Sequence, residues 1–299
     1  MDRPHRHTIF LEEARVLALQ AFPAQQFVLR LEAPQCAARA QPGSFVHLQC
    51  AADIPMRRPL SIRRCDPAAG WIEVLFKIVG PGLRALSAAK AGDRISTLGP
   101  IGQGFVPDPG RPMALLLGGG VGMPPLEFLA MRLAADTATT WRPVAFFGSE
   151  VPFPFKAGRG ALPLHGLDHR LDACQPDLEA LGVPSRLASL AGFDGCYPGY
   201  VTALAGDWLA ALHDDDHDRV ALYACGPHPM LRAVAGLARD FDLPAQLCLE
   251  EFMACGVGGC AGCAVPVQTD AGPAMKRVCV DGPVFEARAV YPELFGQNS

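Results

Sequence analysis

The stretch Cys255-Gly256-Val257-Gly258-Gly259-Cys260-Ala261-Gly262-Cys263, with Cys279 further along, decides what the C-terminal part of this chain must fold around. Four residues separate the first two cysteines, two separate the next pair, and fifteen lead to the last. Three thiolates on one tight loop and a fourth from a distant strand can wrap a rhombic cluster, and this is the plant-type 2Fe-2S spacing. We therefore predict a 2Fe-2S cluster held by Cys255, Cys260, Cys263 and Cys279.

The glycines of this stretch support a cluster. They would let the backbone fold closely around it and aim N–H groups at its sulfurs, where side chains would clash. Zinc is the main alternative, because it also takes four cysteines, but zinc sites usually come as two separated C-x2-C pairs. Cys279 has no close partner in the sequence, and Cys255 is offset by four residues. The pattern favours the cluster over zinc.

Composition bounds the rest of the chain. Its 299 residues, half of them hydrophobic, allow about two ordinary domains and a small appendage. A net charge of −4 argues against nucleic-acid and anionic-membrane partners. The most apolar stretch, 113–126, is short for a membrane span and is broken by glycines and prolines, so we expect no membrane segment. With no export leader, the eleven cysteines predict a cytoplasmic protein with reduced thiols.

The sequence changes in character near residue 108. From about 8 to 107, short alternating runs such as Ile72, Val74 and Phe76 are punctuated by Gly and Pro, which predicts an antiparallel barrel or sandwich. Beyond 107–110, apolar strands at 113–117, 144–148 and 220–224 alternate with helical stretches, at 124–135 and around Met230 to Leu237. This alternation predicts a parallel sheet covered on both faces.

We therefore predict an α+β multidomain protein. An antiparallel β-barrel flavin domain would occupy residues 1–109. An α/β parallel-sheet nucleotide domain would occupy 110–245, and a small C-terminal 2Fe-2S domain 246–299.

A flavin signature lies in the barrel segment. The run 57–62, Arg-Arg-Pro-Leu-Ser-Ile, places a guanidinium, a rigid turn and a hydroxyl on one strand, although a basic surface strand would look the same. The strand residues 75–77 lead to Gly80-Pro81-Gly82 and a short helix expected at 83–88, which would make a natural pyrophosphate seat. The segment 99–105 would close the barrel.

A nucleotide signature follows. The run 118–122, Gly-Gly-Gly-Val-Gly, falls between a strand and a helix, where bare backbone can approach a dinucleotide phosphate. It is not the full G-x-G-x-x-G pattern, and glycine-rich turns are common in α/β folds. Cys225-Gly226-Pro227 ends a later strand at the carboxyl edge, where open sheets bind ligands, or forms only a tight turn with a buried thiol.

Two acidic features have simpler interpretations. Glu150 could accept a ribose hydroxyl and repel a 2′-phosphate, which favours NAD over NADP, but a solvated loop acid would look the same. The run 213–218, His-Asp-Asp-Asp-His-Asp, has metal-like chemistry and is interpreted as a solvated loop.

With these signatures in order, the chain resembles the ferredoxin-reductase superfamily over nearly its whole length. It is most similar to electron-transfer subunits of two-component, NAD-linked (class 1B) dihydroorotate dehydrogenases. The resemblance is strongest in 249–263 and 277–285 and extends to 58–61, 99–105, 118–126 and 199–202. The stretch 151–190 matches poorly.

The resemblance implies roles for individual residues. Arg58 would contact FAD at its phosphates, and Leu60 and Ser61 would contact it at its isoalloxazine. Pro59 would be a further residue of the FAD site. Leu83 stands where the family usually has Thr, and it offers no hydroxyl to the phosphate. Cys225 would be the catalytic residue beside the nicotinamide. The remaining implied contacts are Leu75, Phe76, Lys77, Gly82 and Leu83 for FAD, and Gly118, Gly119, Gly120, Gly122, Gly226 and Pro227 for NAD(H).

The implied function is a change in the number of electrons moved at a time. Nicotinamide moves two electrons as hydride, an iron–sulfur cluster moves one, and flavin does both. The resemblance implies transfer between NAD(H) and the FMN of a dihydroorotate dehydrogenase catalytic subunit through FAD and the cluster, for pyrimidine biosynthesis, in a two-plus-two hetero-oligomer. The alternatives are a sister NAD(P)H reductase subunit serving a ferredoxin-, sulfide- or sulfite-linked enzyme, and a non-catalytic zinc-binding interaction module.

Overall fold

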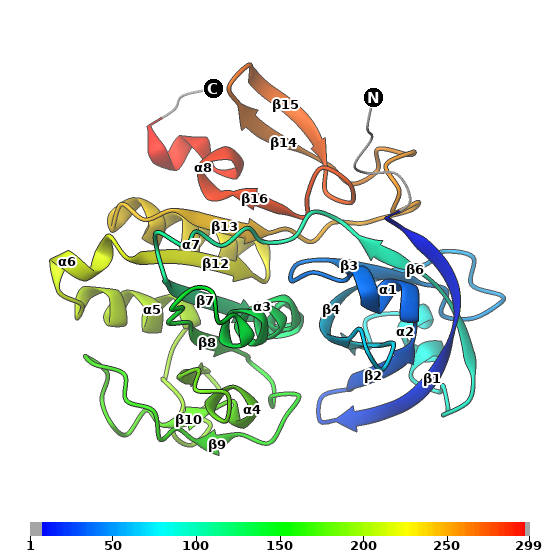
Figure 1. The fold of residues 1–299 in the computed structure, drawn as a ribbon, viewed down its shortest axis with the longest axis horizontal. Helices are drawn as coiled ribbons and strands as arrows, with labels where there is room; N and C mark the ends of the chain where they lie inside the picture. The colour runs from blue at the N-terminus through cyan, green and yellow to red at the C-terminus, as the bar shows by residue number, and fades with distance from the viewer. Residues whose placement is uncertain (1–7, 297–299) are drawn as a thin grey trace.

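The computed structural model describes residues 8–296. A β-barrel lies beside a helix-covered sheet, and a hairpin from the C-terminal part lies above both (Figure 1). No helix within residues 8–296 is both long and apolar enough to cross a membrane.

The barrel confirms the antiparallel prediction. Its strands close in the order β1-β2-β5-β4-β3-β6, and every neighbouring pair is antiparallel. Two short helices, α1 (Pro34–Arg39) and α2 (Pro81–Leu86), accompany it. The strands are β1 (Phe10–Phe22), β2 (Gln26–Glu32), β3 (Phe45–Leu48), β4 (Arg58–Asp66), β5 (Trp71–Lys77) and β6 (Arg94–Ile101).

Alternation along the strands decides which side chains fill the barrel. Leu60 and Ile62 of β4 belong to the barrel core. Because successive side chains of a strand point to opposite faces, Ser61 and Arg63 point outward. The same rule turns Phe45 and His47 of β3 outward, since Val46 and Leu48 lie in the core. The outer face of these two strands thus presents the polar residues Ser61, Arg63 and His47 beside the apolar Phe45 to the rest of the molecule.

The second layer is a sheet in the order β11-β8-β7-β12-β13-β16. Its strands are parallel except β16, which pairs antiparallel with β13. Buried side chains of α3 pack on one face, and those of α5 and α7 on the other, as predicted. The elements are β7 (Met113–Gly119), η1 (Gly120–Gly122), α3 (Met123–Ala135), β8 (Val144–Gly148), β11 (Ser185–Ala188), α5 (Val201–Ala210), β12 (Val220–Cys225), α7 (His228–Asp240), β13 (Ala245–Cys248) and β16 (Val284–Glu286).

This layer also contains several shorter elements. Between β8 and β11 lie β9 (Gly158–Arg159), β10 (Ala173–Cys174) and α4 (Pro176–Glu179). The acidic run predicted as a loop instead forms one helical turn, α6 (Asp214–His217), without a buried residue. Aspartates in a first helical turn complement the helix dipole, which explains the difference.

The C-terminal segment leaves the sheet and returns to it. After β13 the chain forms the cysteine loop and the hairpin β14 (Ala264–Thr269) and β15 (Gly272–Arg277), and β16 then rejoins the sheet edge. The short helices α8 (Ala287–Val290) and η2 (Pro292–Phe295) follow. The cysteine loop is therefore anchored at both ends to one side of the sheet, because β13 (Ala245–Cys248) leads into it and β16 follows it. β13 spans the predicted division at 245/246.

Candidate functional site

The four predicted cluster cysteines lie in two adjoining pairs. Cys260 is exposed on the loop, whereas Cys263 and Cys279 are buried beneath it. Backbone N–H groups point at the sulfurs. Cys255 Sγ accepts from the N–H of Val257 at 3.5 Å and of Cys260 at 3.4 Å, Cys260 Sγ from Gly262 at 3.4 Å, and Cys263 Sγ from Cys279 at 3.5 Å. The loop already presents donors where thiolate charge would lie.

The protonation of the pairs is asymmetric. Burial raises the pKa of the Cys255 thiol, but hydrogen bonds from the backbone and from Cys260 outweigh it and lower the pKa to about 7. Burial and a hydrogen bond with Cys263 raise the pKa of Cys279 to about 12. Within residues 8–296, no three His, Cys, Asp or Glu side chains are gathered as a single metal ion requires. Each iron of a 2Fe-2S cluster would take two thiolates, and the four cysteines supply that number.

Two glycines of the loop are sterically required. Gly256 and Gly258 have positive φ angles of +69° and +79°, a region that side chains disfavour. A Cβ on Gly258 would lie 2.8 Å from Val280 Cγ2, and one on Gly256 would lie 2.7 Å from His47 Nδ1. A methyl group added at Gly259 or Gly262 would not clash with any other atom of the polypeptide.

An arginine anchors the loop to the strand behind it. Arg277 donates from Nη1 to the carbonyl of Gly258 at 3.0 Å. Its Nε lies 3.0 Å from Asp281 Oδ2, which fixes the guanidinium. The hydrogen bond from Arg277 lowers the pKa of the Asp281 carboxyl against the opposing effect of burial. Arg277 and Asp281 therefore tie the backbone at Gly258 to the end of β15.

The predicted flavin residues divide by the strand face that carries them. Ser61 and Leu75 are on the outer rows of β4 and β5, near the cross-strand pair Ile62–Val74. The side chains of Leu60, Phe76 and Leu83 instead belong to the barrel core. The predicted flavin contacts of these three could then come only from the backbone.

Arg58 and Gly82 lie together at the start of α2. A Cβ on Gly82 would be 3.2 Å from Arg58 Nε. The arginine is held by a hydrogen bond from Nη1 to the carbonyl of Met56 at 2.8 Å. The first N–H groups of a helix have no partner within it, so this corner offers both a cation and free donors to a phosphate. The structure brings together the residues predicted to seat the pyrophosphate.

The two nucleotide segments also meet. Cys225 pairs with Gly118 in the β7–β12 register. A Cβ on Gly122 would lie 2.5 Å from the Cys225 carbonyl oxygen, and one on Gly226 would lie 2.6 Å from Met230 Sδ. A Cβ on Gly119 would also lie too close to the Met230 side chain, whereas a Cβ on Gly120 would meet no neighbouring atom. Close packing of both turns leaves bare backbone at the carboxyl edge of β7 and β12, where a dinucleotide would bind.

The Cys225 thiol is buried against Cys248, its register partner on β13. Their hydrogen bond, followed by burial, raises the pKa of Cys225 well above its ordinary value. A protonated buried thiol is a poor nucleophile. Any role at the nicotinamide would therefore be steric positioning.

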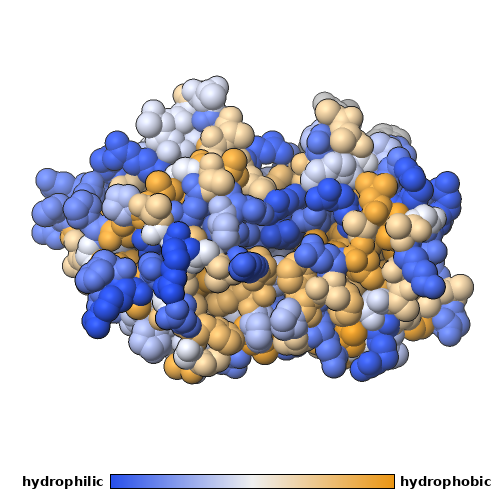
Figure 2. Space-filling view, turned by 90° about the horizontal axis from the view of Figure 1, so that it is seen from below, coloured by the Kyte–Doolittle hydropathy of each residue, from blue (hydrophilic) through white to orange (hydrophobic). Residues whose placement is uncertain are grey.

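A hollow lies beyond the carboxyl ends of β8 and β11, in the region where the sequence offered no prediction. Its volume is about 470 Å³, and Phe153, Phe155 and Phe193 line it together with Phe22 of the barrel and the charged Lys156 and Asp194. Viewed from below, apolar surface is interspersed with hydrophilic regions across the molecule (Figure 2). In the wall of the hollow, Phe153 packs against Phe155 and Phe193, at ring-centroid distances of 5.4 and 6.3 Å.

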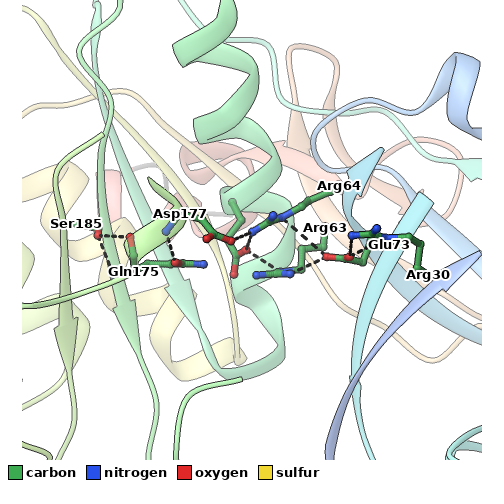
Figure 3. A network of polar contacts seen from close by, with 8 residues as sticks. Arg30, Arg63, Arg64, Glu73, Gln175, Asp177 and Ser185 are labelled. Carbon is green, nitrogen blue, oxygen red and sulfur yellow. Dashed lines mark hydrogen bonds and ion pairs between the residues drawn. The ribbon is translucent and has the colours of Figure 1, made fainter. Parts of the chain in front are cut away.

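A buried ionic network joins the barrel to the nucleotide layer (Figure 3). Arg63 Nη1 donates to Glu73 at 2.6 Å, and Arg63 Nε lies 2.7 Å from Glu127 Oε2 without the alignment of a hydrogen bond. The Glu127 side chain on α3 is 0% exposed and that of Arg63 is 8% exposed. Burial opposes the charge of Arg63, but the carboxylates of Glu127 and Glu73 raise its pKa overall.

Two further contacts extend the network toward solvent. Arg64 pairs with Asp177 of α4, and Arg30 Nη2 lies 2.9 Å from Glu73. The sequence prediction missed this network, because the positions of charged residues on a strand and on a helix do not show which of them form ion pairs in the fold. A glutamate among the apolar residues of α3 was its one visible sign.

Known proteins of one family match this chain over most of its length. It is 32% identical over 279 residues to a protein of Desulforamulus reducens named dihydroorotate dehydrogenase B (NAD(+)), electron transfer subunit, covering 91% of this chain and 95% of that protein. Proteins of the same name from Geobacillus thermodenitrificans and Listeria monocytogenes are 33% and 35% identical, with 93% and 86% of this chain covered, and 98% and 89% of those proteins.

Two other comparisons concern the cysteine segment and the fold. Residues 250–291 match the family model described as the iron-sulfur cluster binding domain of dihydroorotate dehydrogenase B. A solved NADH-dependent reduced ferredoxin-NADP oxidoreductase, studied for flavin-based electron bifurcation, superposes with a TM-score of 0.73 at 24% identity, covering 95% of this chain and 92% of that one. A ferredoxin reductase of carbazole 1,9a-dioxygenase gives 0.58 at 22% identity, covering 79% and 67%. These likenesses establish the reductase fold.

Proposed function

Since the chain belongs to the family of electron-transfer subunits of NAD-linked dihydroorotate dehydrogenase B, we propose that it carries electrons between NAD(H) and the FMN of a catalytic subunit that oxidises dihydroorotate to orotate. The observation that carries the proposal is the loop with two thiol pairs held against the outer face of the flavin-type barrel. Bound FAD would exchange hydride with the nicotinamide and single electrons with the 2Fe-2S cluster.

The polypeptide would bind, orient and shield these groups. Arg58 and the start of α2 would hold the FAD pyrophosphate, and Ser61 would donate to the isoalloxazine. The glycine turn at 118–122 and Gly226 would admit the nucleotide backbone. The buried Arg63–Glu127 pair fixes α3, which begins at that turn, against the strand that carries Ser61. The proposed nucleotide turn would thereby be held to the strand that carries the proposed flavin contact.

We propose the cluster face as the docking surface for the catalytic subunit. Phe252 is 94% exposed and Val257 is 48% exposed, and they flank the ligand Cys255. Cys260 is exposed on the same loop. Large exposed apolar side chains beside a redox centre suit a partner that must approach it closely. A two-plus-two assembly is part of this proposal by family resemblance.

We also propose NAD rather than NADP as the nucleotide, and a cytoplasmic location. Glu150 is exposed immediately after β8, where its carboxylate would repel a 2′-phosphate. All eleven cysteines lie within the described residues and are free, which suits a reducing compartment.

Reconstitution tests the proposal. Anaerobically purified chain should contain FAD, two irons and two sulfides per copy, and it should couple dihydroorotate oxidation to NAD reduction when mixed with an FMN-bearing catalytic subunit. Cys279→Ser should lose iron and coupling, whereas Cys174→Ser, a buried thiol of the nucleotide layer, should lose neither. An intact flavin and cluster without coupling would point to another electron acceptor, and stoichiometric zinc would refute the cluster.

A further inference from the structure

His47 is a buried, uncharged polar residue between the two cofactor segments. It lies on β3, where its cross-strand partner is Pro59 of the flavin segment. The residue is 0% exposed. Because its neighbours Val46 and Leu48 fill the barrel, the imidazole points outward, toward the cysteine loop.

The imidazole contacts both segments. A Cβ on Gly256 would be only 2.7 Å from Nδ1, so the loop backbone lies directly on the ring. The ring also faces the backbone of Arg57 and of Cys255. Arg57 secures the strand from the other side, donating from Nη1 to the carbonyls of His47 at 3.2 Å and Ser96 at 2.6 Å.

The ring nitrogens have polar partners on both segments. Backbone oxygens of Arg57 and Cys255 face them, although within residues 8–296 neither Nδ1 nor Nε2 makes a hydrogen bond of good alignment. An apolar side chain of similar shape would lose both contacts, so the ring does more than fill space between the segments. Burial, and secondarily the charge of Arg57, lower the pKa of His47, so the ring is neutral at pH 7.

We propose that His47 is a positioning residue that joins the flavin segment to the cluster loop and thereby sets the rate of electron transfer between them. This inference rests on the proposed function. Each transfer would move one electron from bound flavin to the cluster without forming or breaking a bond, and the imidazole would be neither oxidised nor protonated. Its part is to hold the backbone of Cys255 and Gly256 at a fixed distance from the strand that carries Pro59 and Ser61.

The test uses the full chain loaded with FAD and cluster, without the catalytic subunit. His47→Phe keeps an aromatic ring at this position, slightly larger than imidazole, and removes both nitrogens. After rapid mixing with NADH, flavin bleaching should proceed at the wild-type rate, while cluster reduction slows by about 10-fold, the lower range for residues behind metal ligands. The cluster midpoint potential, from redox titration with EPR detection, should also shift.

Two further variants keep the result interpretable. His47→Asn places an amide near the Nδ1 position and should recover most of the cluster-reduction rate. His217→Phe replaces a histidine that bonds the carbonyl of Leu209 far from the cluster, and it should leave rate and potential unchanged. If His47→Phe prevents cluster incorporation, the Asn variant decides: wild-type rate and potential support the proposal, and a tenfold loss overturns it.

The proposal is also overturned if His47→Phe matches wild type in both readouts, or slows flavin bleaching and cluster reduction equally. A wild-type chain that transfers electrons internally but does not couple to dihydroorotate would remove the proposed acceptor and leave the role of His47 standing.

Discussion

The barrel meets the nucleotide layer and the cysteine loop through junctions of opposite chemistry. Toward the nucleotide layer, Arg63 lies between the carboxylates of Glu73 and Glu127, with all three side chains below one-tenth exposed. Toward the cysteine loop, the neutral ring of His47 packs on the bare backbone of Gly256. One junction depends on paired charge and the other on shape.

The difference fits the two kinds of transfer proposed. Hydride transfer needs reacting atoms about 3–3.5 Å apart and aligned, and a buried ion pair resists displacement because separating its charges is costly. Single-electron transfer has no such need for bond alignment. A charge beside the cluster would instead shift its potential, which depends on nearby charge and hydrogen bonds. A neutral histidine can fix the distance without adding a charge.

The largest effect should come from breaking the ionic junction. Glu127→Ala leaves the Arg63 charge with Glu73 as its remaining buried partner, and breaking a buried pair typically costs about 3–5 kcal/mol. Chemical denaturation of the FAD-loaded chain measures this loss. The double variant Arg63→Met/Glu127→Leu removes both charges and should recover much of it, because apolar pairs often replace buried ion pairs without loss. A single-variant loss under about 1 kcal/mol would show that this junction does not depend on charge.

A smaller effect should follow from disturbing the shape-dependent junction. Gly258→Ala forces a side chain into the left-handed region, at about 1–2 kcal/mol, and places its Cβ 2.8 Å from Val280 Cγ2. We expect reduced iron and sulfide content with FAD content unchanged, measured colorimetrically and by absorbance. Gly236→Ala is the matched control, because that glycine lies in α7 with open space around it and alanine favours helix. Equal iron content in both variants would contradict the steric account.

Local patterns in the sequence predicted the elements but not the contacts that join them. The alternation of Ile72, Val74 and Phe76 predicted a barrel strand, and the structure places all three in the barrel core. The same alternation would have turned Phe76 inward and Leu75 outward, but the family resemblance grouped both as flavin residues. Period-two patterning is therefore the better guide to side-chain direction, while the binding of flavin by this segment stays a prediction.

Long-range partners had no local signal. From the sequence, Arg63 could be interpreted only as one residue of a basic strand. Its ion-pair partner Glu127 lies in the other layer and is distant in the sequence. The return of β16 to the sheet edge was also hidden, since Val284–Glu286 is a short strand after a cofactor segment. His47 drew no attention either, because a single histidine on a strand is ordinary until its burial and its contact with Gly256 are known.

The smallest effect should come from the exposed end of the ionic network. Asp177→Asn removes the charge that pairs with Arg64, but the Asp177 side chain is 55% exposed, so solvent already screens the pair. Exposed ion pairs contribute about 0–1 kcal/mol, and Arg64 retains the carboxylates of Glu127 and Glu73 at 3.9 Å.

Denaturation midpoints of Asp177→Asn and Glu127→Ala, compared at low and high salt, separate the two ends of the network. The Asp177 variant should lose its small difference from wild type in high salt, whereas the deficit of the Glu127 variant should persist because water and ions do not reach that pair. Equal deficits at both positions would mean that position along the network, rather than burial, sets the strength of this junction.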